Sequence, residues 1–383
     1  MTAYSNSLTT VSILTNCFEV RMESRIQLLT DAELSRLKEI LASARHVVVC
    51  CHKSPDGDAV GSSLAWTDYL LQTAGDEGRE VTVVLPDAAP DFLHWMPGFN
   101  TRVMRYDKKP EEVKALLDKA DLVCCLDFNT SSRTEDMKEA LDGCQAPKLL
   151  LDHHLQPDME TVMSVSRPDL SSTCELVFCL IWQLGGYEAM SKECAQCLYV
   201  GMMTDTGGFT YNSSRPEIFW IISQLLSKGI DKDRIYNRVY HNYSTSCMRL
   251  RSYVIYRKMR VIEELRAAYF SITKEEMQRF RFKRGDAEGL VNEPLKIKGL
   301  KLSISLREDT ERPNLILVSL RSSCGFHCEK MAREFFNGGG HEDAAGGKLY
   351  CSVEEAEQVA LKAIMAYREQ LGGVKFSNGC KKL

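Results

Sequence analysis

The chain lacks three features that would place it in a special class of protein. It has no apolar run of roughly 18 residues, so we expect no membrane span and no membrane partner. It has no excess of positive charge, because 48 Lys and Arg face 52 Asp and Glu, which argues against a broad surface for long duplex nucleic acid. No Lys or Arg precedes Arg21 and no clear apolar core is present there, so we expect a cytoplasmic protein without a secretory signal.

Cysteine, by contrast, is abundant, with 15 residues in a chain of 383. Cys50, Cys51, Cys124 and Cys125 lie inside apolar runs, where a cysteine acts as a small hydrophobic side chain. A chain of this length can bury a core without disulfide bonds, so we expect free thiols in a reducing compartment. The CxxC that begins at Cys194 lacks a second such pair and lies in a helical pattern, which argues against a zinc or redox site.

Apolar strands alternate with helices in the N-terminal half of the chain. Their runs of Val, Leu and Cys are too apolar to face water, which is typical of parallel strands buried on both faces. Three such strands are Val47–Cys51, Asp121–Leu126 and Lys148–Leu151. The alternation predicts a doubly wound parallel α/β sheet, and shorter strands beyond residue 261 predict a smaller C-terminal α/β domain.

We expect five segments along the chain. Their limits follow from the change of pattern, from a cation-rich helical stretch before the second domain, and from the polar ends of the chain. The segments are an N-terminal extension (1–24), a catalytic domain (25–245), a helical connector (246–260), a substrate-binding domain (261–372) and a tail (373–383).

The stretch His52-Lys53-Ser54-Pro55-Asp56-Gly57-Asp58 joins the first strand to a predicted helix. In an open α/β sheet such turns lie at the carboxyl ends of the strands, where ligands bind. The carboxylates of Asp56 and Asp58 repel each other. A divalent metal ion, with His52 as a further ligand, is the simplest way to balance their charge. A solvated acidic turn is the alternative interpretation of this motif by itself.

Residues of the same chemistry follow other strands and end one helix. Carboxylates and imidazoles without a thiolate favour Mn²⁺, with Mg²⁺ as the alternative, over zinc. The ligands outnumber what one ion can use, so we expect two ions about 3.5–4 Å apart that share a carboxylate. The full set is His52, Asp56, Asp58, Asp127, Asp152, His153 and Asp205.

Five motifs occur in a fixed order along the chain. They are His52-x3-Asp56-x-Asp58, Asp127, Asp152-His153-His154, Thr204-Asp205-Thr206-Gly207, and Gly338-Gly339-Gly340-His341 with Ala344-Ala345-Gly346. The first four resemble the successive motifs of the DHH phosphoesterase superfamily, and the fifth resembles the signature of the DHHA1 domain. The order and spacing suit the nanoRNase and pAp-phosphatase branch of oligoribonuclease-like enzymes, over about residues 25 to 370.

The resemblance implies a role for each residue of the first four motifs. A hydroxide held between two ions would attack the phosphorus atom of the substrate. His154 would either orient the site or form a hydrogen bond with the phosphate. Asp152 would fix a ligand imidazole through a hydrogen bond, with direct coordination as the alternative. Asp127 would bridge the two ions and so be catalytic. The other metal ligands would be His52 and Asp56 on one ion and Asp58, His153 and Asp205 on the other.

The second domain is expected to bind the substrate. Gly339 and Gly340 would let backbone N–H groups approach a phosphate or base, because no Cβ intervenes. His341 can donate to a phosphate or stack on a base. Arg321, with Ser322, follows a strand and can bind phosphate through its planar fork, although a surface cation is the alternative.

The run Arg279-Phe280-Arg281-Phe282-Lys283-Arg284 alternates cations with aromatic rings. Such alternation is typical of an edge that meets nucleic acid. A solvated edge explains the same pattern equally well, and the sequence does not separate the two.

The resemblance implies a Mn²⁺-dependent phosphoester hydrolase. We expect it to degrade short RNA in the 3′→5′ direction to mononucleotides and to dephosphorylate 3′-phosphoadenosine 5′-phosphate (pAp). A phosphodiesterase for cyclic dinucleotides or linear pApA is the alternative, and a nucleotide sensor without turnover is the second. Dimers occur in the family, so a homodimer is compatible with the resemblance.

Overall fold

The structure is a computed structural model that describes residues 22–75, 78–283 and 285–372. The chain divides into two compact units, Met1–His241 and Asn242–Leu383. The expected tail, and the expected extension up to residue 21, lie outside the described residues, and the five segment limits stay a prediction. Within the described ranges no helix is long and apolar enough to cross a membrane.

The first unit is built on a six-stranded sheet in which all neighbouring strands are parallel. The strand order is β3-β2-β1-β4-β5-β6, so it reverses between β1 and β4, which is the switch point of a doubly wound fold. The predicted fold class is confirmed. The strands are β1 His46–Cys50, β2 Glu80–Leu85, β3 Val103–Arg105, β4 Leu122–Leu126, β5 Lys148–Asp152 and β6 Met163–Ser166.

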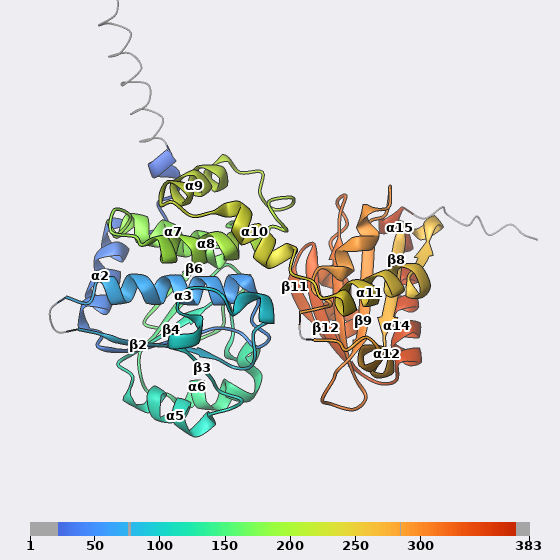
Figure 1. Cartoon of the computed structure of the whole chain (residues 1–383), viewed down its shortest axis with the longest axis horizontal. Coiled ribbons are helices and arrows are strands. Elements are labelled where there is room, and N and C mark those ends of the chain that lie inside the picture. Colours follow the sequence, from blue (N-terminus) through green and yellow to red (C-terminus); the bar gives the residue numbers. More distant parts are fainter. Residues whose placement is uncertain (1–21, 76–77, 284, 373–383) are drawn as a thin grey trace, which may run out of the picture. The chain divides into compact units, whose positions relative to one another are not determined.

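Helices cover both faces of this sheet, because successive side chains of a strand point to opposite faces. Val47 and Val49 of β1 belong to the core cluster with α3, α7 and α8, whereas Val48 and Cys50 belong to the cluster with α5 and α6. Figure 1 shows these two helical layers above and below the sheet. The helices are α2 Asp31–Ser43, α3 Gly57–Gln72, α4 Phe99–Arg102, α5 Pro110–Lys119, α6 Lys138–Gly143, α7 Thr173–Gln183, α8 Lys192–Asp205, α9 Pro216–Ser227 and α10 Lys232–Tyr240.

Short polar side chains start several of these helices. Thr30 and Glu33 form a capping box at the start of α2. Asp56 caps α3 by accepting hydrogen bonds from the N–H groups of Asp58 and Ala59, and Ser172 caps α7. Because Asp56 is also a predicted metal ligand, one side chain both starts the helix and belongs to the candidate site.

The second unit contains a mixed six-stranded sheet in the order β11-β12-β10-β9-β8-β7. Only β8 and β9 pair in parallel; the other neighbours are antiparallel. This confirms the predicted smaller α/β domain. The strands are β7 Arg260–Ile262, β8 Ala267–Ile272, β9 Leu302–Glu308, β10 Leu315–Ser322, β11 Gly339–His341 and β12 Ala344–Tyr350.

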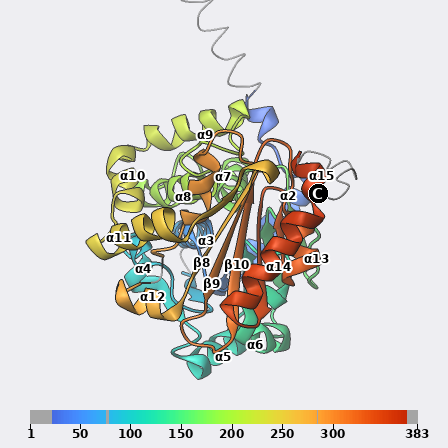
Figure 2. The same ribbon diagram turned by 90° about the vertical axis from the view of Figure 1, so that its right-hand side faces the viewer.

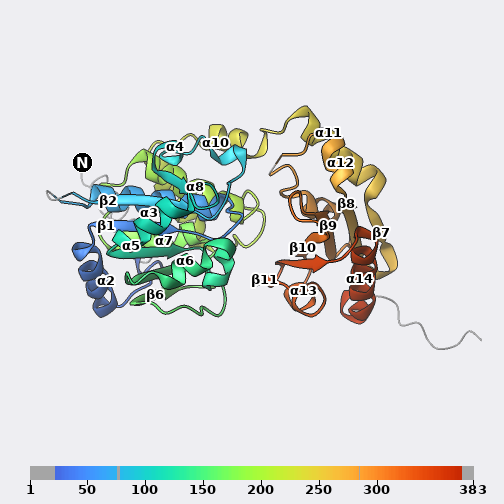
Figure 3. The same ribbon diagram turned by 90° about the horizontal axis from the view of Figure 1, so that it is seen from below.

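Both faces of the second sheet are also covered by helices. One core cluster joins the sheet to α13 and α14, and another joins it to α11 and α12, as Figure 2 shows. In Figure 3, α13 lies beside β11. The helices are α11 Thr245–Tyr253, α12 Lys274–Arg279, α13 Glu329–Phe336, α14 Val353–Ala366 and α15 Arg368–Leu371, with a π-helical segment η3 Val254–Lys258 and a 3-10 segment η5 Leu290–Lys296.

The cysteines in the described part of the chain are free thiols, and most are buried. Cys50 and Cys125 lie opposite each other on β1 and β4, with their sulfur atoms 4.0 Å apart. Burial raises the pKa of Cys124 to about 12 and that of Cys197, in the CxxC, also above its ordinary range. Such thiols stay protonated near neutral pH and are poor nucleophiles.

Candidate metal centre

The predicted metal ligands come together at the carboxyl end of the first sheet. His52 follows β1, Asp127 follows β4 and His153 follows β5, so three adjacent strands each deliver one side chain. The switch point between β1 and β4 lies within this set, where doubly wound folds bind ligands. The first turn of α3 and the last residue of α8 deliver the remaining three, which are Asp56, Asp58 and Asp205.

These side chains form two groups of possible ligands. In the first group, ligand atoms of His52, Asp56 and Asp127 lie within 4.8 Å of one another. In the second group, those of Asp58, His153 and Asp205 do the same. Each group combines one imidazole with two carboxylates, a donor set that suits a divalent cation of the Mn²⁺ kind.

Asp127 lies between the two groups. Its Oδ2 is 3.5 Å from Nε2 of His52, and its Oδ1 is 3.5 Å from Nε2 of His153. The residue is buried and has a φ of 64°, which is uncommon for a residue other than glycine. Backbone strain of this kind is often found at functional sites, where the surrounding structure holds it.

Both imidazoles direct Nε2 toward the carboxylates. Nδ1 of His52 donates to the carbonyl oxygen of Lys53 over 2.9 Å, and Nδ1 of His153 donates to that of Leu170 over 3.4 Å. A carbonyl oxygen can only accept, so Nε2 is the atom left for a metal ion or a second proton. From Nε2 of His153, the Asp205 carboxylate lies 3.4 Å away. Two atoms bound to one ion at about 2.1 Å each lie about 3–3.5 Å apart, so these separations fit a shared cation.

The charges of the centre are strongly coupled. Burial, together with Asp127 and Asp205, raises the pKa of Asp58 well above its ordinary value. Burial acts the same way on Asp127, but hydrogen bonds with His153 and His52 hold its pKa well below the usual range. Burial opposes charge on His153, yet Asp127, Asp205 and Asp58 raise its pKa well above 6.5. The metal-free centre therefore retains protons that a divalent cation would displace.

The start of α7 holds two of the carboxylates. The N–H of Thr173 donates to Oδ2 of Asp58 over 2.6 Å, and the N–H of Cys174 donates to Oδ1 over 2.8 Å. The hydroxyl of Thr173 also donates to Oδ1 of Asp127 over 3.0 Å. A helix N-terminus favours negative charge, so α7 stabilises ionised Asp58 against the effect of burial. Thr173 was not among the predicted site residues, because it directly follows the helix cap Ser172 and no motif of the site includes it.

Close packing of α3 and α8 brings Asp58 and Asp205 together. A Cβ on Gly201 would lie 2.2 Å from Sγ of Cys174 and 2.8 Å from Oδ1 of Asp58, which is closer than real Cβ contacts. Because a side chain at Gly201 would meet Cys174 of α7 and Asp58 of α3, this glycine lets α8 pack closely against both helices at the site.

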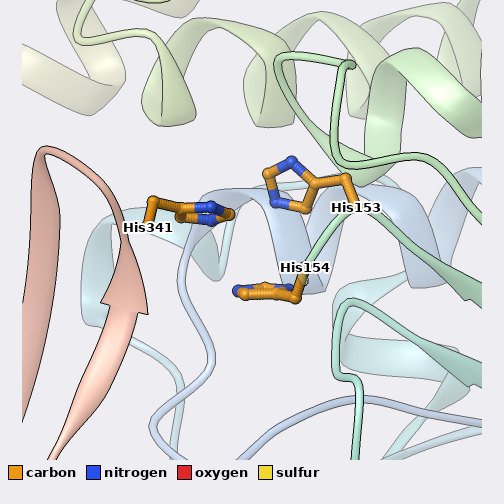
Figure 4. A group of neighbouring side chains, drawn as sticks. All are labelled: His153, His154 and His341. Carbon is orange, nitrogen blue, oxygen red and sulfur yellow. The ribbon is translucent and has the colours of Figure 1, made fainter. Parts of the chain in front are cut away.

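Asp152 and His154 form a pair beside Asp127. Nδ1 of His154 lies 2.7 Å from Oδ1 of Asp152. Figure 4 shows the rings of His153 and His154, which meet edge to face with centroids 4.8 Å apart. Asp152 was expected to fix a predicted ligand imidazole; the structure places its Oδ1 against His154, which lies in the bend directly after β5.

The Asp152–His154 pair has two further properties. Oδ2 of Asp152 is buried without a hydrogen-bond partner among the described residues, and ligand atoms of Asp127, Asp152 and His154 form a third group within 4.8 Å. Burial lowers the pKa of His154 more than Asp152 raises it, so the ring is neutral near pH 7. An unpaired buried carboxylate oxygen is costly, which leaves Asp152 suited to a cation or to a water molecule.

In the second unit, three adjacent strands bring the predicted substrate residues to one end of the sheet. Arg321 on β10 pairs with Ala344 on β12, which pairs with His341 on β11. Two strand spacings, about 9–10 Å, therefore separate the backbones of Arg321 and His341. Nε of Arg321 is buried without a hydrogen-bond partner among the described residues, while its Nη1 donates to the carbonyl oxygen of Leu320 over 2.9 Å. The hydroxyl of Ser322 is engaged locally, since it accepts from the N–H of Cys328.

The glycine run is explained largely by packing within this sheet. A Cβ on Gly338 would lie 1.8 Å from the carbonyl oxygen of Gly346, and one on Gly340 would lie 2.6 Å from that of Ala344. Gly340 also has a φ of 146°, which disfavours other residues. A Cβ on Gly339 would meet its nearest neighbour only at 4.0 Å, so at this position the run remains open to an approaching group.

Comparison with known proteins agrees with this arrangement. The DHH family, N-terminal domain, matches residues 46–202, and the DHHA1 domain matches residues 266–370. The crystal structure of an exopolyphosphatase-related protein from Bacteroides fragilis is 46% identical, covers 90% of this chain and 99% of its own, and superposes with a TM-score of 0.82.

Two curated relatives are more distant. The bifunctional oligoribonuclease and PAP phosphatase NrnA of Thermus thermophilus is 26% identical over 85% of this chain and 90% of its own length. The cyclic-di-AMP phosphodiesterase PdeA of Listeria monocytogenes is 26% identical over 92% of this chain, but over only 52% of its own length. Fold, site and matches together define a phosphoester hydrolase. The chain belongs to the DHH family and carries a DHHA1 domain in its second unit.

Proposed function

We propose that the chain hydrolyses short oligoribonucleotides from the 3′ end to mononucleotides and removes a phosphate from pAp, with two Mn²⁺ ions as cofactors. Family membership supports the reaction class, and the relative that is named an oligoribonuclease and PAP phosphatase supports the substrates. The absence of a positive net charge supports a short substrate rather than a long duplex. A cytoplasmic location, a homodimer and the finer segment limits belong to this proposal as well.

The observation that carries the proposal is the position of Asp127. Its two oxygens face different imidazoles at the same separation, 3.5 Å, and each imidazole has further carboxylates within 4.8 Å. A carboxylate that faces two donor groups in this way is suited to bridge two ions. We therefore assign His52 and Asp56 to one ion, Asp58, His153 and Asp205 to the other, and Asp127 to both.

The residues of the chain hold and orient the reacting groups. When bound, the metal ions supply the acidity that makes water a nucleophile near neutral pH. The start of α7 orients Asp58 through two backbone N–H groups, which favour the ionised form that a bound cation needs. His154 is neutral and donates through Nδ1 to Asp152, so its Nε2 is an acceptor. This favours hydrogen bonding from a water molecule or a sugar hydroxyl over binding of an ionised phosphate oxygen.

The second unit is proposed to bind the rest of the substrate. Arg321 offers an unpartnered Nε and would bind a phosphate, with His341 two strand spacings away. Gly339 and Gly340 would bring backbone N–H groups close to the same ligand, with Ser322 supporting the end of β10. If the Arg321→Ala variant binds a dinucleotide as tightly as the wild type, Arg321 is not part of the substrate-binding surface.

Asp127→Ala tests the bridge. We expect loss of about 100-fold or more of Mn²⁺-dependent hydrolysis of a labelled RNA dinucleotide, because both ions lose a ligand. Asp107→Asn, which neutralises a surface carboxylate bonded to Arg105, is the matched control and is expected to keep its activity. Circular dichroism checks that both variants fold. Near-normal turnover in Asp127→Ala would reject the bridging role.

A phosphodiesterase acting on cyclic dinucleotides or linear pApA is the second candidate. The similarity to PdeA over 92% of this chain favours it. A panel of RNA dinucleotides, pAp, pApA and cyclic dinucleotides with measured kcat/KM decides between the two, since that ratio measures discrimination. Binding of these compounds without any product would favour the third candidate, a nucleotide sensor.

A further inference from the structure

A cavity in the second unit lies at the opposite end of its sheet from the predicted substrate residues. It has a volume of about 160 Å³ and is formed by α12, the segment that follows α12, and the connection between β9 and β10. Strand β10 begins at this connection and ends near Arg321, 8 residues or about 26 Å further on. The cavity is thus separate from the Arg321–His341 end of the sheet. Its lining residues are Lys274, Met277, Gln278, Arg281, Phe282 and Thr310.

Two cations of the lining, the ammonium of Lys274 and the guanidinium of Arg281, form no ion pair with a carboxylate of the described residues. The neighbouring carboxylates are engaged with backbone groups: Glu308 accepts from the N–H of Lys274, and Asp309 accepts from two N–H groups of its own loop. Two positive charges that face one cavity repel each other unless an anion lies between them.

Phe282 adds a flat apolar wall to this charged cavity. The guanidinium of Arg307 lies over its ring, 5.3 Å from the centroid, which is a cation–π distance. Arg281 has a φ of 51°, so the chain turns sharply here and both Arg281 and Phe282 contribute to the lining. Of the run of cations and aromatic rings seen in the sequence, Arg281 and Phe282 line the cavity, whereas Arg279 and Phe280 pack against Tyr253 and Arg284 lies outside the described residues.

The size of the cavity limits its ligand. A volume of about 160 Å³ holds about five water molecules, and a cavity of about 150 Å³ can accept a benzene ring. A phosphate group or a single base ring therefore fits inside, and because the cavity is partly open to solvent, the rest of a mononucleotide can extend from it.

We propose that this cavity is a second nucleotide-binding site, specific for a nucleoside monophosphate. Lys274 and Arg281 bind the phosphate through charge-assisted hydrogen bonds, Thr310 offers a hydroxyl, and the base lies along Phe282. The choice of a monophosphate rests on the proposed function, whose products are mononucleotides. The site itself rests on the charges and the ring that line the cavity.

Titration calorimetry with AMP tests the site. The full chain is titrated in EDTA, which removes metal-dependent binding and turnover, and every variant also carries Arg321→Ala, which removes the phosphate ligand proposed at the other end of the sheet. We expect Arg281→Gln and Lys274→Gln each to weaken AMP binding about tenfold. Lys283→Gln, an adjacent exposed cation outside the lining, is the matched control and is expected to change the affinity less than about twofold.

Two comparisons identify the ligand chemistry. AMP should bind more tightly than inorganic phosphate, which lacks the base, and more tightly than adenosine, which lacks the charge. If AMP and inorganic phosphate bind with equal affinity, the base makes no contact with Phe282, and the assignment of a nucleotide to this cavity is wrong. Absence of AMP binding in the Arg321→Ala background, or an equal loss in Lys283→Gln and Arg281→Gln, would overturn the proposal.

Failure of this site and failure of the proposed function are distinguishable. Hydrolysis of an RNA dinucleotide with Mn²⁺ is measured separately in the wild-type chain. A chain that hydrolyses the dinucleotide but shows no Arg281-dependent AMP binding would lose only the cavity proposal. A chain that binds AMP through Arg281 without hydrolysing any nucleotide would keep the cavity and lose the enzyme assignment.

Discussion

At the scale of single residues, Asp127 and Thr173 arrange the carboxylates of the metal centre. Asp127 could be proposed from sequence because an acidic residue directly after an apolar strand is a local signal. Thr173 could not, because its backbone bond to Asp58 joins residues 115 positions apart and its hydroxyl bond to Asp127 joins residues 46 apart. Neither separation leaves a pattern along the chain.

Thr173→Val should weaken metal binding. Valine keeps the branched shape of threonine but removes the hydroxyl that donates to Oδ1 of Asp127. We expect Mn²⁺ affinity to fall about tenfold, the lower end of the effect of losing a hydrogen bond to a metal ligand. Calorimetric Mn²⁺ titration of the metal-free protein measures this. Thr173→Ser restores the hydroxyl and should bind like the wild type; equal affinities of Val and Ser variants would show that the hydroxyl does not matter.

The metal-free protein should lose stability as pH rises. The raised pKa of His153 lies well above 6.5, so its contribution is complete below pH 6.5 and is lost as pH rises through the folded-state pKa. The raised pKa of Asp58 acts in the same direction, because the unfolded chain releases that proton first. We expect Tm in EDTA to fall as pH rises above 6.5, and the gain in Tm on adding Mn²⁺ to grow over the same range.

Scanning fluorimetry with and without Mn²⁺ measures both trends. His153→Asn removes the ring and should flatten the profile in EDTA. A Tm in EDTA that stays constant or rises across this range would contradict the assigned protonation of the centre.

At the scale of elements, long apolar or amphipathic segments were predictable and short, glycine-rich strands were not. The apolar run of β4 and the capping box of α2 are local and strong. Strand β12, Ala344–Tyr350, contains two glycines and has no clear alternation, so its sequence resembles a loop. It becomes a strand because β10 and β11 pair with it on both sides.

Gly201→Ala should disturb the approach of α3 and α8. The new methyl group would meet Sγ of Cys174 and Oδ1 of Asp58 at distances that no packed structure tolerates. We expect the free energy of unfolding to fall by about 1–3 kcal/mol, as for overpacked cores, and Mn²⁺ affinity to fall with it. Urea unfolding and Mn²⁺ titration measure the two effects.

Gly143→Ala is the control for the Gly201 substitution. A Cβ at Gly143, at the end of α6, would meet no heavy atom within 4 Å. This variant should keep both its stability, within about 0.5 kcal/mol, and its metal affinity. Unchanged Mn²⁺ affinity in Gly201→Ala would show that the spacing of α3 and α8 does not position the ligands.

At the scale of the whole molecule, the division into two units follows from two separate sheets with their own cores. The change of pattern near residue 261 made two domains predictable. The expectation of shorter strands there is wrong, because β9 and β10 have 7 and 8 residues, whereas β1 and β4 have 5 each. The pairing order of the second sheet was not predictable, because β7 and β11 have only three residues each and β12 contains two glycines and lacks a clear alternation.

Mn²⁺ should protect the first unit selectively, since the six proposed ligands all lie within Met1–His241. A concentration 100 times Kd stabilises a protein by about 2.7 kcal/mol. Hydrogen exchange with mass spectrometry should show slower exchange at the starts of α3 and α7 and no change in β9 and β10. Equal protection of both units, or protection that persists in Asp127→Ala, would contradict this location of the ions.

The amino-acid sequence by itself determined the fold class, the two-domain plan and the chemical identity of the site residues. These three properties follow from the periodicity of hydrophobic residues and from the polar residues at strand ends, both of which are local features of the sequence. Tertiary structure decided which oxygen of Asp127 faces which imidazole, that Asp152 contacts His154, and that Thr173 binds two carboxylates. It also decided that Lys274 and Arg281 share a cavity, because contacts set by folding rather than by sequence spacing bring side chains into one site.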